Sequence, residues 1–278
     1  MLLVVAALQL VVIDMTGKPF HFPISVRDFI LNLALLNSTG LESGPTFNAV
    51  SWSISTEMVV NCIFLMIIAL PRRFSIPALF ALFVIAASVV FSGHLITNAR
   101  PYGIDNDVFR TIFGFLIGTA LWNLQRRMQM TAGLGFDMLF LLSVGAVMAY
   151  CELGEYGNTG DLWSTVVLFP AVIIAAQRGK VARTVLRTTP LVWLGTISYS
   201  IYLIHFTAEI IAYLIGIVSG KTLPYGSAFF FVAYLLSIIV AASITYLFIE
   251  IPGKNFAKRL FYRAFPFLRN NSSLPSSI

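Results

Sequence analysis

Apolar residues recur along the 278-residue chain in long runs rather than in alternating or heptad patterns. Short segments with turn-forming residues, such as Pro71-Arg72-Arg73, separate these runs. A bilayer core about 30 Å thick needs about 20 apolar residues in a helix, and lipid-exposed backbone must satisfy its own hydrogen bonds. The pattern therefore predicts transmembrane helices over residues 50–70, 76–96, 108–124, 134–151, 162–177, 191–218 and 228–250.

The amino-terminal run differs from the others in its length. Leu2 to Ile13 would form a helix of only about 18 Å, which is too short to cross a bilayer. It is interpreted either as a re-entrant or interfacial segment or as the outer part of a span whose beginning is missing. Val26 to Asn37 predicts either a short amphipathic helix or another incomplete crossing. We therefore expect an all-α, polytopic membrane bundle with about seven full transmembrane helices and one partial amino-terminal helix.

Composition supports this fold class. Hydrophobic residues make up 58% of the chain and charged residues only 11%, with a mean hydropathy of +0.86. A soluble domain carries about 25% charged residues, so a cytosolic enzyme, a disordered chain and a coiled coil are excluded. Cys62 and Cys151 fall at different predicted depths and lack metal-ligand spacing, so neither a disulfide nor a metal site is expected.

Charged residues alternate from one connecting segment to the next. Segments 71–75, 125–133, 178–190 and 251–278 hold 13 basic residues and no acidic ones. Segments 14–49, 97–107, 152–161 and 219–227 hold four basic and eight acidic residues. The positive-inside rule places the first set in the cytoplasm, and both termini with it. The net charge of +6 thus indicates topology and contact with membrane lipid, and no nucleic-acid partner is expected.

Polar residues within the predicted spans are candidates for chemistry, because they are costly in lipid. In the span that begins at Trp52, helical spacing puts Ser53, Glu57 and Asn61 on one face. Two interpretations of Glu57 stay open: a packing partner of a neighbouring helix, or a carboxylate in a polar site.

A second polar stripe lies in the span over 191–218. Ser198, Tyr202, His205 and Glu209 follow one another at helical spacing on an otherwise apolar helix. His205 could pair with Glu209 and carry a proton, or it could be a packing residue. The choice between these two stays open.

Other ionisable residues lie near the ends of predicted spans. Arg110 could extend its charge to the interface or hold an anionic group. Asp137 is expected to be solvated at the interface. Glu250 is expected to pair with Lys254, in a helix that Pro252 and Gly253 should end.

Four patterns in chain order resemble the acyltransferase family 3 of membrane proteins. They are Trp52-Ser53-x-Ser55-x-Glu57, Arg110-x-x-x-Gly114-Phe115-Leu116-Ile117-Gly118, Leu194-Gly195-x-Ile197-Ser198-Tyr199-Ser200-x-Tyr202-Leu203-x-His205 and Ile249-Glu250-x-Pro252. The resemblance implies a ten-span domain in the cell membrane. It implies transfer of an acyl group, commonly acetyl, from a cytoplasmic donor such as acetyl-CoA to a hydroxyl of an envelope glycan or lipid. No bound cofactor is implied.

The resemblance also suggests roles for particular residues. Glu57 and His205 would be the catalytic candidates, in supporting acid–base or orienting roles. The substrate-binding candidates are Trp52, Ser53, Arg110, Ser198, Tyr199 and Tyr202. Residues 1–252 would form the acyltransferase-like domain, and residues 253–278 a basic cytoplasmic tail.

One feature of the family is absent from this sequence. The family's first helix carries Arg or His, ten residues and then a His that is central to catalysis. Eleven positions before His21, His94 and His205 stand Leu10, Phe83 and Leu194. The chain is therefore expected to be an amino-terminally truncated member with little acyl transfer of its own. A rival hypothesis is a transporter or flippase for an envelope precursor, with Glu57, His205 and Glu209 as a proton relay.

Overall fold

The computed structural model describes residues 1–20, 24–42, 44, 46–92, 100–128, 132–153, 163–221 and 223–264. Within these ranges every regular element is helical, which confirms the predicted all-α class. The chain divides into two compact units, Met1–Trp193 and Leu194–Ile278. The predicted domain boundary at residue 252 stays a prediction.

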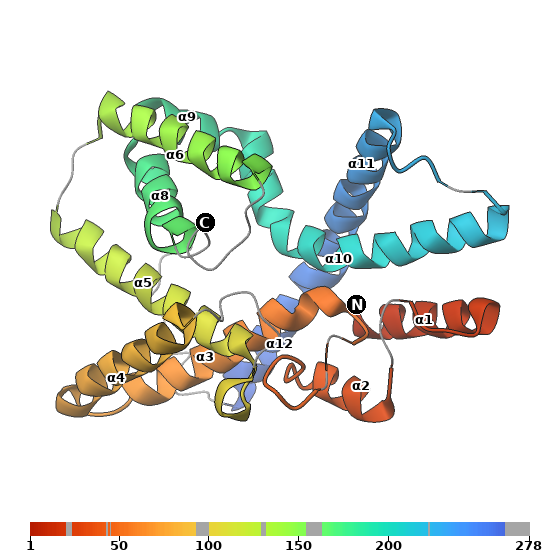
Figure 1. The fold of residues 1–278 in the computed structure, drawn as a ribbon, viewed down its shortest axis with the longest axis horizontal. Helices are drawn as coiled ribbons and strands as arrows, with labels where there is room; N and C mark the ends of the chain where they lie inside the picture. Colours follow the sequence, from red (N-terminus) through yellow and green to blue (C-terminus); the bar gives the residue numbers. More distant parts are fainter. Residues whose placement is uncertain are drawn as a thin grey trace. The chain divides into compact units, whose positions relative to one another are not determined.

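The first unit contains the helices up to the start of α10 (Figure 1). They are α1 (Leu2–Thr16), α2 (Val26–Leu33), α3 (Trp52–Ile68), α4 (Arg72–Phe91), α5 (Asn106–Met128), α6 (Leu134–Leu153), α8 (Phe169–Arg178) and α9 (Lys180–Leu186). Two single turns, η1 (Ala49–Ser51) and η2 (Pro101–Gly103), precede α3 and α5, and the π-helical turn η3 (Ser164–Leu168) leads into α8.

The second unit takes in most of α10 (Thr189–Ser219), followed by α11 (Ala228–Thr245), the π-helical turn η4 (Tyr246–Glu250) and α12 (Ile251–Ala264). The prediction that Pro252 and Gly253 end the helix is wrong. Proline breaks a helix by lacking an N–H and by crowding the carbonyl four residues before it. Here the π-helical turn already interrupts the regular hydrogen-bond ladder, so Pro252 sits in the first turn of α12 without ending the helix.

Five helices of the described chain are apolar and long enough to cross a membrane: Ala49–Ile68, Arg72–Phe91, Leu134–Glu152, Thr189–Ser219 and Ala228–Arg263. A sixth would be the bent pair Ser164–Arg178 and Lys180–Leu186. The remaining predicted span, 108–124, lies within α5, which is long but carries Asp107 and Arg110 in its first turns and Arg126 and Arg127 in its last. These elements agree with a multi-pass membrane protein.

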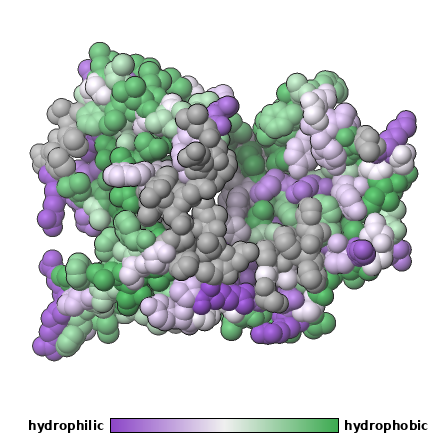
Figure 2. Space-filling model, viewed as in Figure 1, coloured by the Kyte–Doolittle hydropathy of each residue, from purple (hydrophilic) through white to green (hydrophobic). Residues whose placement is uncertain are grey.

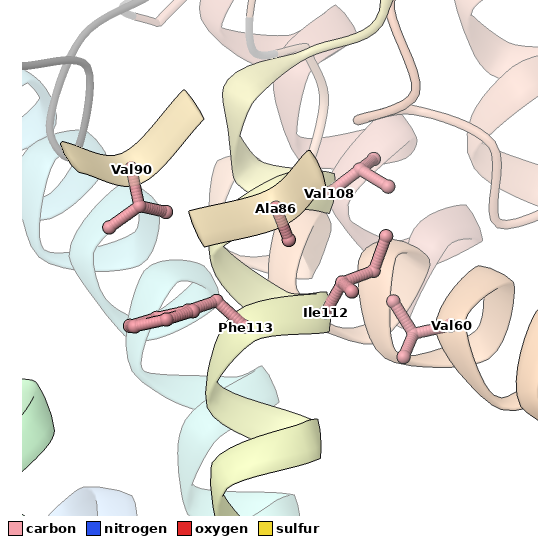
Figure 3. Packing of buried hydrophobic residues seen from close by; sticks show 6 residues of the cluster. All are labelled: Val60, Ala86, Val90, Val108, Ile112 and Phe113. Carbon is pink, nitrogen blue, oxygen red and sulfur yellow. The ribbon is translucent and has the colours of Figure 1, made fainter. Parts of the chain in front are cut away.

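A cluster of buried apolar side chains joins α3, α4 and α5 (Figure 3). Val60 of α3 and Ala86 and Val90 of α4 meet Ile112 and Phe113 of α5. The rings of Phe83 and Phe113 stack with their centroids 5.5 Å apart. This packing brings the amino-terminal ends of α3 and α5 together, and the polar side chains discussed below lie there.

Large apolar side chains also cover outward faces of the helices, as the hydropathy colouring in Figure 2 shows. Phe80 of α4, Leu142 of α6 and Phe229 of α11 are examples with 66% or more of their surface exposed. A soluble monomer rarely exposes such extensive apolar surface. These faces are suited to contact with lipid.

The amino-terminal part agrees with the short elements predicted for it. Leu2–Thr16 is a 15-residue helix that ends where Gly17 takes a left-handed conformation, with a φ of 72°. In α2 the side chain of Ser25 accepts a hydrogen bond from the backbone N–H of Asp28 and so caps the helix. This helix ends at Leu33, four residues earlier than predicted, and Leu35 has a positive φ of 55°.

Candidate functional site

Between α2 and α3, the described residues 34–42, 44 and 46–51, here called the 34–51 segment, are folded around a buried carboxyl group. The side chain of Asn32 on α2 donates to Oε1 of Glu42 at 2.8 Å and to Oγ1 of Thr46 at 2.9 Å. The Thr46 hydroxyl contacts Oε2 of the same Glu42 carboxyl at 3.0 Å. Glu42 is only 2% exposed. A buried polar cluster of this kind holds a loop in one conformation only while its members stay paired.

Burial raises the pKa of the Glu42 carboxyl from 4.5 to about 7. The hydrogen bond with Thr46 favours the ionised form, and the hydrogen bond from Asn32 adds to this effect, but both are outweighed. The negative charges of Asp28 and Asp105 raise the pKa further. Glu42 is therefore largely protonated in mildly acidic solution and gains a charge near neutral pH.

Arg100 and Asp105 connect the 34–51 segment to the start of α5. The Nε of Arg100 lies 2.7 Å from Oδ1 of Asp105, and its guanidinium also donates to the backbone carbonyl of Glu42. The other oxygen of Asp105 accepts the backbone N–H of Gly40 at 3.0 Å. A cation and a carboxylate from one short stretch thus hold the backbone of the segment at two points.

Two residues that the sequence selected separately lie together at this end of the unit. The guanidinium of Arg110 on α5 stacks over the ring of Trp52 on α3, 4.5 Å from its centroid. Asp107, one turn before Arg110, lies 3.0 Å from Nη2 of Arg110 and accepts a hydrogen bond from Ser38 at 3.1 Å. The charged group is thereby held in one orientation by an aromatic face and a carboxylate.

Glu57 lies one turn further along α3 and is exposed, whereas its neighbours Ser55 and Thr56 are buried. Ser55 bonds to the 34–51 segment through the carbonyl of Leu35, and Thr56 contacts Thr111 of α5 at 3.0 Å. The inward face of α3 thus carries the hydroxyl groups. Ser53 is half-buried, in the first turn of the same helix.

In the second unit, α10 carries the other predicted site residues. The ring centroids of Tyr202 and His205 lie 5.7 Å apart, and both residues are half-buried. The hydroxyl of Tyr234 on α11 donates to the backbone carbonyl of His205 at 3.1 Å. Ser198 and Tyr199 are exposed.

Sequence reasoning missed Ser200, which is the most buried hydroxyl of this motif. Its side chain is 3% exposed, and Oγ donates to Oε2 of Glu250 in η4 at 2.8 Å. The prediction that Glu250 pairs with Lys254 is wrong, because no ion pair joins these two side chains in the described chain. A carboxylate in an apolar helix needs a donor, and this need could have pointed to one of the serines of α10.

The expectation that Asp137 is merely solvated is also wrong. Its Oδ2 accepts the backbone N–H of Lys180 at 3.0 Å, and its Oδ1 accepts that of Ala182 at 2.9 Å. Asp137 on α6 thus caps the amino terminus of α9 from a different helix. Sequence spacing could not show this contact, because more than 40 residues separate the partners.

Replacing Asp137 with Ala is expected to weaken α9, because the first amides of this helix lose their carboxylate acceptor. Hydrogen exchange of the Lys180 and Ala182 amides, with the protein in lipid nanodiscs, measures this effect. Glu152→Ala is the matched control, because Glu152 is exposed at the other end of α6. Equal protection in the two variants would contradict the capping role.

Within the described residues, no three His, Cys, Asp or Glu side chains are grouped as metal ligands. Cys62 and Cys151 are both exposed and form no disulfide with each other in the described chain. Among the described residues, the polar features that include sequence-predicted site residues are the Trp52–Arg110–Asp107 cluster in the first unit and the α10 stripe with Glu250 in the second.

The long apolar helices of the described chain define a multi-pass helical membrane protein. Residues 1–247 match the family described as the acyltransferase domain, and the chain belongs to this family. A protein named membrane-bound transacylase BcsY, from Komagataeibacter xylinus, is 27% identical over 217 residues, which cover 75% of this chain. The chain spans about half the length of this curated relative, 52%. No solved structure matches this chain.

Proposed function

We propose that this chain provides the membrane domain of an acyltransferase. It would transfer an acyl group, acetyl in the first instance, from a cytoplasmic acyl-CoA to a hydroxyl of an envelope glycan or lipid. The observation that carries the proposal is the family match over residues 1–247. The proposed location is the cytoplasmic membrane with both termini inside, as the alternation of charge favours.

The proposed reaction is attack by the acceptor hydroxyl on the thioester carbonyl. A general base takes the hydroxyl proton as the new C–O bond forms, and hydrogen-bond donors stabilise the oxyanion. The C–S bond then breaks, and the leaving thiolate accepts a proton. Glu57 and His205 are the proposed supporting acid–base or orienting groups, each on an apolar helix.

Arg110 is proposed to bind an anionic part of the donor or acceptor. Its geometry supports this role, because Trp52 and Asp107 fix the guanidinium while its side chain remains 28% exposed. Trp52 and Ser53 would contribute to the same binding surface. Ser198, Tyr199 and Tyr202 are the proposed binding residues in the second unit.

The test measures formation of an alkali-labile ester from radiolabelled acetyl-CoA in membranes that contain the protein. It uses the chain as printed and a second form expressed with any in-frame codons that precede Met1 in its gene. Acetyl-CoA-dependent ester formation above that of empty membranes supports the proposal. If neither form makes an ester, although each is inserted at normal yield, the proposal is wrong.

In whichever form is active, Glu57→Gln is expected to lower acyl transfer at least about tenfold, or roughly 1.4 kcal/mol of barrier. Gln keeps the size of the side chain but cannot ionise, and Glu57 is exposed, so folding should be little affected. Transfer per inserted molecule is compared with that of Glu152→Gln, an exposed control. Full activity of Glu57→Gln would remove Glu57 from the proposed site.

A further inference from the structure

The connection between α8 and α9 is a sharp elbow. The two helices meet at an angle of 86° with only Gly179 between them. A Cβ at Gly179 would lie 2.4 Å from Oδ1 of Asp137 and 3.0 Å from the carbonyl of Ala175. The carboxylate of Asp137 fills this corner and accepts the first amides of α9. The angle is therefore fixed by side-chain contacts and by the space that Gly179 leaves.

The seven residues of α9 and the Arg187 that follows it separate into two faces. At 100° per residue, Lys180, Arg183 and Arg187 fall on one side, together with Thr184. Val181, Val185 and Leu186 fall on the opposite side, together with Ala182. Ala182 is buried, because α9 packs on α6, but the other three apolar side chains are 56%, 50% and 41% exposed. The packing thus leaves most of the apolar face open.

The charges around α9 are of one sign. Residues 178–190 contain four basic and no acidic side chains. The acidic group that contacts this helix, Asp137, accepts its first backbone amides, and the charge of Lys180 also stabilises this carboxylate. Arg183 and Arg187 lie further along α9. The basic face is therefore available to an anionic partner.

The direction of α9 identifies the surface that it fits. The apolar stretch Ser164–Arg178 precedes it at an angle of 86°, and wherever this stretch runs across the bilayer, α9 lies near the plane of the bilayer. A helix in that plane with one basic and one apolar face suits the boundary between headgroups and acyl chains. A soluble anion would account for the basic side chains but not for the exposed valines and leucine.

We propose that α9 is an interfacial helix that binds the anionic phospholipids of the inner leaflet. Val181, Val185 and Leu186 insert between acyl chains, while Lys180, Arg183 and Arg187 contact phosphate groups. The elbow at Gly179 sets the depth of α8 and α6 relative to this surface. The inference concerns lipid binding and does not depend on acyl transfer.

The first experiment measures the depth of single positions in the full chain, in phosphatidylglycerol-containing nanodiscs. With Cys62 and Cys151 replaced by Ser, spin labels are placed at Val181, Thr184 and Val185 in turn. Labels at Val181 and Val185 are expected to be relaxed mainly by oxygen from the lipid phase, and the label at Thr184 by a water-soluble nickel complex. Equal accessibility of Thr184 and Val185 to both agents would overturn the proposal.

The second experiment measures phosphatidylglycerol retained by the detergent-solubilised protein, using native mass spectrometry. Each basic residue at a membrane surface contributes about fivefold in binding. Removing all three in Lys180→Gln/Arg183→Gln/Arg187→Gln should therefore reduce phosphatidylglycerol affinity at least about tenfold. Phosphatidylcholine binding should not change.

The matched control is Lys254→Gln/Lys258→Gln/Arg263→Gln, which removes the same formal charge from α12 and should have a smaller effect. An equal loss in the control, or no loss in the α9 variant, would contradict the proposal. If the α9 variant had a higher KM for acetyl-CoA but unchanged lipid binding, the basic face would belong to the acyl donor instead. This result would also overturn the proposal. Lys180→Arg should retain lipid binding.

Discussion

Raising the pH from about 4.5 to about 7 is expected to lower the free energy of opening the 34–51 segment by about 3 kcal/mol. The closed form is the folded segment with Glu42 buried, and the open form is the locally unfolded segment. Glu42 is the cause, because its carboxyl is buried against Asn32 and Thr46 and has a pKa near 7. The open segment exposes this carboxyl to water, where its ordinary pKa is 4.5. Between these two values only the open form releases its proton.

The sign of the effect follows from the bound proton. Below pH 4.5 both forms are protonated, and the stabilisation of the closed form is fully present. As the pH rises to about 7, the closed form keeps a proton that the open form has lost, so closure becomes less favourable. Above about 7 both forms are ionised and the dependence levels off.

Hydrogen exchange of the backbone amides of Ser38 and Gly40, corrected for intrinsic exchange rates, measures this opening free energy across pH 4.5–8. Glu42→Gln is the informative variant, since Gln resembles the protonated acid in shape and hydrogen bonding. It should match the unmodified protein near pH 5 and be more stable near pH 8. A Glu42→Gln variant with the same pH dependence as the unmodified protein would show that another group is responsible.

Gly40→Ala is expected to destabilise the same segment by about 3 kcal/mol or more. Gly40 has a φ of 100°, a conformation that residues with a Cβ rarely adopt. An added Cβ would also lie 2.3 Å from the carbonyl oxygen of Gly103, a backbone atom that cannot rotate away. Relief would require the backbone to move, which would break the 3.0 Å hydrogen bond from Gly40 to Asp105.

Gly44→Ala is the matched control, because no atom lies within 4 Å of a Cβ added there and its φ is not positive. Both variants are compared by hydrogen exchange of the 34–51 amides and by the thermal midpoint in detergent. The expected result is a loss for Gly40→Ala and little change for Gly44→Ala. Similar behaviour of the two would mean that the close approach to Gly103 is not a real constraint on the segment.

The helical elements could be predicted largely from hydropathy, because long apolar runs admit few structures in a bilayer. The run over 76–96 follows α4 as far as Phe91, with residues 93–96 outside the described chain, and the run over 191–218 lies within α10. The continuation past Pro252 was not predictable from local propensity. It depends on the π-helical turn before it, which has no sequence signature of its own.

The polar contacts were less predictable, since they join residues far apart in the sequence. Trp52 and Arg110 were selected separately, and only the packing of α3 against α5 shows that they touch. Glu42 lies in a segment without hydrophobic periodicity, so nothing local marked it as buried. Ser198 and Ser200 are equivalent by residue type, and only the fold shows that Ser200 faces Glu250. The catalytic roles assigned to Glu57 and His205 stay predictions.

The π-helical turn Tyr246–Glu250 separates two helices that would otherwise be continuous. A π-helical turn holds one residue more than an α-helical turn, and each residue corresponds to about 100° of rotation. The outward faces of α11 and α12 therefore follow different rotational phases. Deleting one residue between Tyr246 and Glu250 would remove this difference in phase. Every basic side chain of α12 would then be rotated about the helix axis relative to α11. The direction in which Lys254, Lys258 and Arg263 point is thus encoded in the length of a stretch that contains none of them.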